Sequence, residues 1–180
     1  MKKLKNLVLS ASGVLAFSLM FASVSNAQDA PKLSDAEIAS VAVTANQIDI
    51  DYAAIAAKKS TNKDVLNFAK TMQDDHKAVI DMAVKLVTKL NVTPKTNAVT
   101  QSLLDGAKKT AKMLNSKSGK AFDKAYIDNE VAYHEAVIGA VETILIPQAQ
   151  NAELKGLLEK VLPALRTHLE HAKMVQKNFK

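Results

Sequence analysis

The chain has no cysteine and no tryptophan, and its glycine, proline and aromatic residues are few. The absence of cysteine excludes disulfide bonds, catalytic thiols and metal sites built on thiolates. Alternating apolar and polar runs joined by hairpin turns are absent too, so no β-strand is predicted. A Ser-His-Asp arrangement and a phosphate-binding loop are also lacking. The sequence therefore offers no complete catalytic constellation of a familiar kind.

One long apolar stretch is present, at residues 7–21, and three lysines precede it. Small residues then occupy positions 25–27, where a signal peptidase recognises its site. We predict a signal peptide over residues 1–27, cut after Ala27, and a periplasmic or otherwise exported protein. No later apolar run is long enough to span a bilayer, so no integral membrane segment is expected after cleavage.

Removal of the leader and its three lysines lowers the formal net charge from +6 to +3. A charge this small, spread along helices, gives no reason to expect nucleic-acid binding. Residues 28–33 are predicted to be a short flexible lead. Residues 34–180 are predicted to form one domain, which is long enough to bury a core.

The first half of this domain carries two long helical patterns. The first helix begins at a capping box, in which Ser34 caps the helix and Glu37 reaches back, and it continues to about residue 59. A break at residues 60–62 separates it from a second helix that ends near residue 90. So short a break predicts an antiparallel helical hairpin.

The second half carries another pair of helices. A third helix is predicted over about residues 120–146, where Pro147 closes it. Asn151 is placed to cap a fourth helix that continues almost to the C-terminus. Pro163 lies inside this fourth pattern and predicts either a slight kink or a restart of the helix.

Residues 91–119 connect the two hairpins and contain a weaker helical pattern over residues 98–114. A helix of about 17 residues is near 25 Å long, enough to carry the chain most of the way back along a bundle. We therefore predict an all-α, ferritin-like four-helix bundle. It consists of two antiparallel helical hairpins and a long crossover that contains an extra short helix.

Three of the four histidines each occupy one position of an otherwise apolar heptad stripe. His76 lies in the second predicted helix, His134 in the third and His168 in the fourth. Such a stripe faces the core of a helix bundle, so these imidazoles are expected to point inward. The fourth histidine, His171, lies one turn past His168. Inward imidazoles are either hydrogen-bonded core residues or metal ligands.

Two acidic residues accompany these histidines. Asp75 directly precedes His76, as a second ligand or as an outer partner of the imidazole. Glu130 lies four residues before His134, on the same helix face. Counted from the turn between the third and fourth helices, Glu130 and His168 fall within about 3 Å of the same height. The candidate metal ligands are His76, His134, His168, His171, Glu130 and Asp75. A divalent transition metal such as zinc, copper or iron suits them.

Two other interpretations stay open from the residues alone. In one, the imidazoles form a structural polar layer and bond to neighbouring carboxylate, amide and tyrosine groups. In the other, the bundle is a di-iron oxidase, which needs a Glu-x-x-His motif on two helices and a glutamate on the other two. Here Glu130 and His134 are four residues apart, and no glutamate stands three residues before His76. The first helix offers Asp49 beside its apolar stripe but no glutamate there. The di-iron pattern is thus broken.

The chain resembles a family of exported bacterial proteins called domain of unknown function 4142. The matching segments are residues 33–46, 68–76, 122–134 and 168–172. The resemblance implies a ferritin-like four-helix bundle, and it implies no particular chemistry. It directs attention to Met72, Asp75, His76, His134, His168 and His171.

These observations favour an exported helical bundle that binds a transition metal through inward-facing histidines and carboxylates. The alternative is a non-enzymatic envelope or stress-related protein, structural or partner-binding, with a structural histidine layer. In both cases an enzymatic activity is not expected. The sequence does not define a partner protein or an oligomeric state.

Overall fold

The computed structural model describes residues 31–179, and this part of the chain is helical with no strand. The prediction of an all-α bundle is therefore confirmed. The predicted signal peptide lies outside the described residues.

Five helices in the described part of the chain are long: α2 (Asp35–Lys59), α3 (Lys63–Lys89), α4 (Ala98–Asn115), α5 (Gly119–Ala140) and α7 (Ala152–Gln176). Three elements are short: η2 (Val141–Leu145), α6 (Ile146–Gln148) and η3 (Lys177–Phe179). Among the described residues, no helix is long and apolar enough to cross a membrane.

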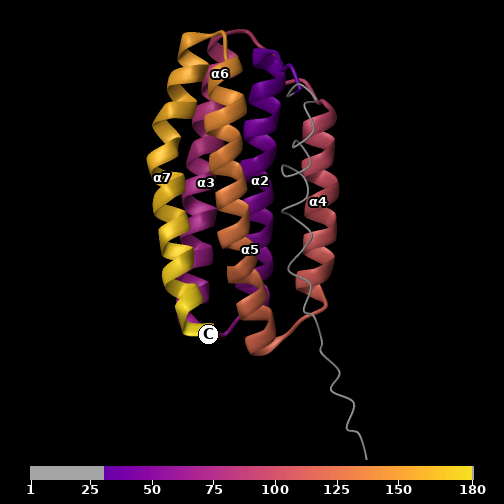
Figure 1. The fold of residues 1–180 in the computed structure, drawn as a ribbon, viewed down its shortest axis with the longest axis vertical. Helices are drawn as coiled ribbons and strands as arrows, with labels where there is room; N and C mark the ends of the chain where they lie inside the picture. Colours follow the sequence, from indigo (N-terminus) through magenta and orange to yellow (C-terminus); the bar gives the residue numbers. More distant parts are fainter. Residues whose placement is uncertain (1–30, 180) are drawn as a thin grey trace, which may run out of the picture.

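Helices α2 and α3 form one antiparallel hairpin and α5 and α7 form a second, as Figure 1 shows. Helix α4 is the crossover between them and packs outside the four, along α2. The Lys95 amide donates to the Ala36 carbonyl where both helices begin, and the Lys59 ammonium donates to the Asn115 carbonyl where both end. Helix α4 therefore runs in the direction of α2. Its 18 residues, Ala98–Asn115, agree with the helix of about 17 residues predicted over residues 98–114.

The helix ends lie where the sequence places capping side chains. Asn62 accepts from the amides of Asp64 and Val65 at the start of α3, and Asn151 accepts from two amides at the start of α7. Ser34 and Glu37 form the predicted capping box at the start of α2, in which the Glu37 carboxylate accepts from the backbone amide of Ser34 at 2.9 Å. Each bond satisfies an amide that the first turn leaves without a helical partner.

Two prolines shape the second hairpin. Before Pro147, the helix widens into the π turn η2, in which the Ile146 amide bonds the Val141 carbonyl five residues back. Proline has no amide to donate, and a π turn accommodates that loss. Pro163 does not break α7, which is a single helix from Ala152 to Gln176. The predicted restart at Pro163 is therefore not found.

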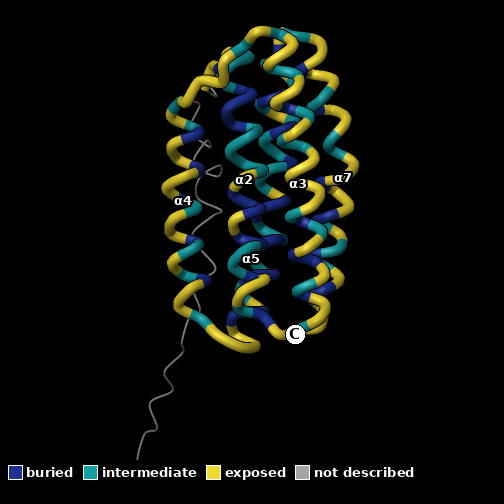
Figure 2. Tube along the Cα trace, turned by 180° about the vertical axis from the view of Figure 1, so that it is seen from behind, coloured by how far each residue is buried: buried dark blue, intermediate teal, exposed yellow. Residues whose placement is uncertain are grey.

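The core runs the length of the bundle and has two different halves, separated by the level of His76, His134 and His168. On each of the long helices, the buried positions lie on the side that faces the interior of the bundle, as Figure 2 shows. We call the part toward the α2–α3 turn the aromatic half, defined by Tyr52, Phe68, Phe122 and Tyr126. The part toward α6 is the aliphatic half, defined by Val41, Val141, Leu154 and Leu158.

Candidate metal centre

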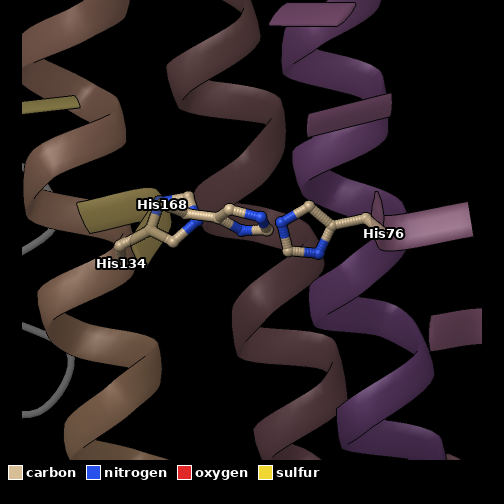
Figure 3. Close-up of side chains that lie close together, drawn as sticks. All are labelled: His76, His134 and His168. Atoms are coloured by element: carbon tan, nitrogen blue, oxygen red, sulfur yellow. The ribbon is translucent and has the colours of Figure 1, made fainter. Parts of the chain in front are cut away.

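Three histidines from three helices meet at mid-bundle. His76 comes from α3, His134 from α5 and His168 from α7, and their rings gather between the helices (Figure 3). The ring centroids are 5.8 Å apart for His76 and His134, 5.2 Å for His76 and His168, and 5.5 Å for His134 and His168. All three side chains are buried. The heptad positions of these histidines predicted this inward orientation.

Two fully buried carboxylates adjoin the imidazoles. Asp49 of α2 places its Oδ2 atom 3.2 Å from His76 Nε2 and 3.5 Å from His134 Nε2. Glu130 of α5 places its Oε2 atom 3.8 Å from His134 Nδ1. Both carboxylates have a relative exposure of 0 %. The four main helices α2, α3, α5 and α7 thus each supply at least one ionisable group to one buried cluster.

One nitrogen of each imidazole is held by an oxygen acceptor. His76 Nδ1 lies 2.7 Å from Asn46 Oδ1, and the Asn46 amide group is itself oriented by donating to the Ala42 carbonyl. His134 Nδ1 lies 2.9 Å from the Glu130 backbone carbonyl. A carbonyl oxygen only accepts, so the Nδ1 atoms of both rings carry the proton.

His168 follows the same pattern with its two nitrogens exchanged. Its Nε2 atom lies 2.9 Å from Oδ2 of Asp75 and donates a hydrogen bond to it, so in this ring Nε2 carries the proton. The nitrogens that remain are Nε2 of His76, Nε2 of His134 and Nδ1 of His168, and all three are buried with no hydrogen-bond partner. Each therefore presents a lone pair. Because buried polar atoms rarely go unsatisfied, three such lone pairs in one place call for an explanation.

The protonation states follow from burial and from the neighbouring charges. Burial lowers the pKa of His134 to about 4, and it lowers the pKa of His168 as well. Burial and the Asp49 charge raise the pKa of Glu130 well above its usual value. Burial raises the pKa of Asp49, but the positive charge that the imidazoles of His76 and His134 carry when protonated lowers it, and the net shift is downward. At neutral pH the imidazoles of His134 and His168 are therefore neutral, and Asp49 is charged.

Two overlapping sets of donor atoms lie close enough together that each could hold a metal ion after small side-chain movements. The ligand atoms of His76, His134 and His168 lie within 4.8 Å of one another, and those of Asp49, Glu130 and His134 do so too. Imidazole nitrogen together with carboxylate oxygen suits zinc, iron and copper ions. A metal-bound histidine usually donates a hydrogen bond from its other ring nitrogen, and the acceptor of that bond fixes the tautomer.

Comparison with known proteins places the whole bundle in one family. Residues 21–175 match the family described as domain of unknown function (DUF4142). The chain belongs to this family. No curated protein and no solved structure matches the chain. The DUF4142 segment includes every residue of the histidine cluster, and its description assigns no activity.

The structure of this DUF4142 protein brings together four of the six candidate ligands: His76, His134, His168 and Glu130. It places Asp75 differently, since this residue is exposed and bonds the outer nitrogen of His168. His171 lies outside the cluster, half-buried, with its ring centroid 5.1 Å from that of Phe68.

Sequence reasoning did not include Asp49 or Asn46 among the candidate ligands and their partners. Asp49 was considered only as the one acidic residue beside the first apolar stripe. The available signal was an aspartate inside a run of residues that is otherwise mostly apolar, Ile48 to Ala56. The role of Asn46 depends on its contact with another helix, and no spacing along α2 indicates it.

Proposed function

We propose that this protein is an exported, ferritin-like bundle that binds one divalent transition metal ion at mid-bundle. The ligands are His76 Nε2, His134 Nε2, His168 Nδ1 and the Asp49 carboxylate. The observation that carries the proposal is the convergence of three buried imidazole lone pairs, each on a ring whose other nitrogen is bonded.

Electrostatics supports a cation at this position. A carboxylate oxygen and an imidazole lone pair repel each other at the 3.2 Å that separates Asp49 from His76, and a cation between them turns the repulsion into attraction. A buried charge without compensation is costly, so the negative Asp49 gains from a positive neighbour. Two ligands of one zinc ion lie at most about 4.2 Å apart, twice a Zn–N bond. Small movements of the side chains would therefore close the set around the ion.

The test compares His134, which belongs to the cluster, with His171, which lies outside it. Metal-free wild-type protein is titrated by calorimetry with zinc, iron(II) and copper(II), beside the His134→Ala and His171→Ala variants. We expect stoichiometric binding of at least one ion, a loss of about a hundredfold or more in affinity for His134→Ala, and no change for His171→Ala. If no ion binds, or if the two variants bind alike, the proposal is wrong.

One observation favours a second candidate, a structural polar layer without metal. Because its pKa is raised well above the usual value, Glu130 keeps a proton that it can share with the neighbouring Asp49. The protein would then be a non-enzymatic envelope protein, and His134→Ala would lower the free energy of unfolding by about 1–3 kcal/mol without affecting any ligand. A metal-dependent rise in melting temperature contradicts this second candidate.

A further inference from the structure

The aliphatic half of the bundle is hollow. A cavity of about 340 Å³ lies among α2, α3, α5 and α7, directly against the histidine cluster. Its walls are almost entirely alkyl side chains. They include Val41, Ala42, Val79, Ala83, Val137 and Leu158. Tyr133 is the sole aromatic residue among them, and its hydroxyl donates to the Ala45 carbonyl.

This volume is large for the interior of a small bundle. Protein interiors pack as densely as organic crystals, and their voids rarely exceed a water molecule. An apolar cavity of about 150 Å³ already binds a benzene molecule, and ligand pockets usually begin near 300 Å³. The cavity is therefore in the size range of ligand sites, and its walls offer water few hydrogen-bond partners.

The cavity has a polar end, an apolar end and an entrance. Its polar end is the histidine cluster, including His76 and His168. Its far end lies near Val87, and the distance from His76 to Val87 along α3 is about 16 Å. Exposed lining residues of α3 and α7, among them Ala78 and Ala164, mark an entrance between these helices.

We propose that the cavity binds a single-chain aliphatic amphiphile, with its polar head at the histidine cluster and its alkyl chain toward α6. The alkyl walls match a flexible chain better than a planar ring, because aromatic partners are almost absent. The unpartnered nitrogens of His76 and His168 accept a hydrogen bond from a hydroxyl head group. The charged Asp49 beside them disfavours a carboxylate head as long as no cation is bound.

The binding test uses metal-free mature protein, so that it does not depend on the proposed metal site. Wild-type protein is titrated with 1-decanol, beside Ala83→Leu, which fills the cavity, and Ala57→Leu, which lies exposed on α2 outside it. We expect saturable binding of one molecule, at least a tenfold weaker affinity in Ala83→Leu, and no change in Ala57→Leu.

Two results would overturn the inference: 1-decanol fails to bind the wild-type protein, or it binds Ala83→Leu as tightly as the wild type. If Ala83→Leu does not fold, Ala42→Leu replaces it, since Ala42 lines the same cavity from α2. A separate titration with decanoate, with and without zinc, tests the head group. Tighter decanoate binding with zinc would show that the metal ion and the head group meet. If 1-decanol binds but none of zinc, iron(II) and copper(II) does, the cavity ligand is supported and the metal site is rejected.

Discussion

The two halves of the bundle share the same four helices but differ in how their side chains fill the space between them. In the aromatic half, Tyr52, Phe68, Phe122 and Tyr126 are at most 1 % exposed and fill the core. In the aliphatic half, alanine, valine and leucine leave a cavity of about 340 Å³. Apolar periodicity is present in both halves, so side-chain size, not pattern, decides which half is solid.

The histidine cluster lies at the boundary between these halves, and the comparison suggests why. The aromatic half packs under the imidazoles and the carboxylates and keeps them dry, which shifts the pKa values of His134 and Glu130. The aliphatic half leaves the same groups accessible to a small molecule. The histidine cluster is thus closely packed on one side and borders the cavity on the other.

A matched pair of leucines tests the difference in packing most strongly. Leu114 is fully buried at the aromatic end, whereas Leu158 lines the cavity. We expect Leu114→Ala to lower the free energy of unfolding by about 4–5 kcal/mol and Leu158→Ala by about 2–3 kcal/mol, because atoms facing a cavity have fewer packing partners. Urea denaturation measures both. Equal losses would show that the two halves are packed alike.

Acid titration tests whether the imidazole of His134 is shielded from water in the folded protein. The pKa of His134 is about 4 in the folded protein, below the value of about 6.5 in the unfolded chain. The unfolded chain therefore binds more protons between these values, and this contribution to stability is present above pH 6.5 and lost as the pH falls toward 4. We expect a loss of about 3 kcal/mol in metal-free protein.

The control for this titration replaces His134 by glutamine. The proton-linked part of the pH dependence between pH 6.5 and 4 should disappear in His134→Gln and persist in His171→Gln, since His171 lies outside the cluster. Identical pH profiles for wild-type and His134→Gln proteins would mean that the imidazole is hydrated in solution.

Metal removal tests whether the histidine cluster binds an ion. An ion that binds only the folded state at a hundred times its dissociation constant adds about 2.7 kcal/mol to the free energy of unfolding. We expect zinc, or whichever ion binds, to raise the melting temperature by about 5–11 °C, and a chelator to reverse this. The Asp49→Asn variant should show a smaller rise, because it removes the charged ligand. A melting temperature indifferent to both ion and chelator would contradict a metal centre.

The smallest expected effect concerns the outer partner of His168. Asp75 accepts from Nε2 of this ring and fixes its tautomer, so Asp75→Asn should weaken metal binding by about tenfold. Its neighbour Asp74 bonds Lys70 on the surface, and Asp74→Asn should have no effect. Equal affinities in the two variants would show that the tautomer of His168 does not depend on Asp75.

The sequence predicted the helices well because their signals are local. The caps at Asn62 and Asn151 can be recognised without knowledge of the rest of the chain. The histidine positions were also predictable, since a polar residue in an apolar stripe points inward. The prediction of His171 as a ligand was wrong. Although it lies only three residues from His168, its ring packs against Phe68 and not in the histidine cluster.

The features that escaped prediction depend on contacts between helices. Asp49 lies on α2, which is covered by α4 as well as by α3 and α5, so burial there extends beyond a single stripe. Asp75 was placed beside His76 by its sequence position, yet it bonds His168 on another helix. The cavity depends on the summed volumes of side chains from four helices, which no local pattern reports.

The central claim is that three histidines and Asp49 bind one metal ion. The most direct test is X-ray absorption spectroscopy on protein purified without chelator or affinity tag. The account predicts one bound zinc, iron or copper ion, with three imidazole nitrogens and at least one carboxylate oxygen at about 2.0–2.2 Å. Metal-free protein that binds no added ion, or an ion without imidazole ligands, would contradict the account.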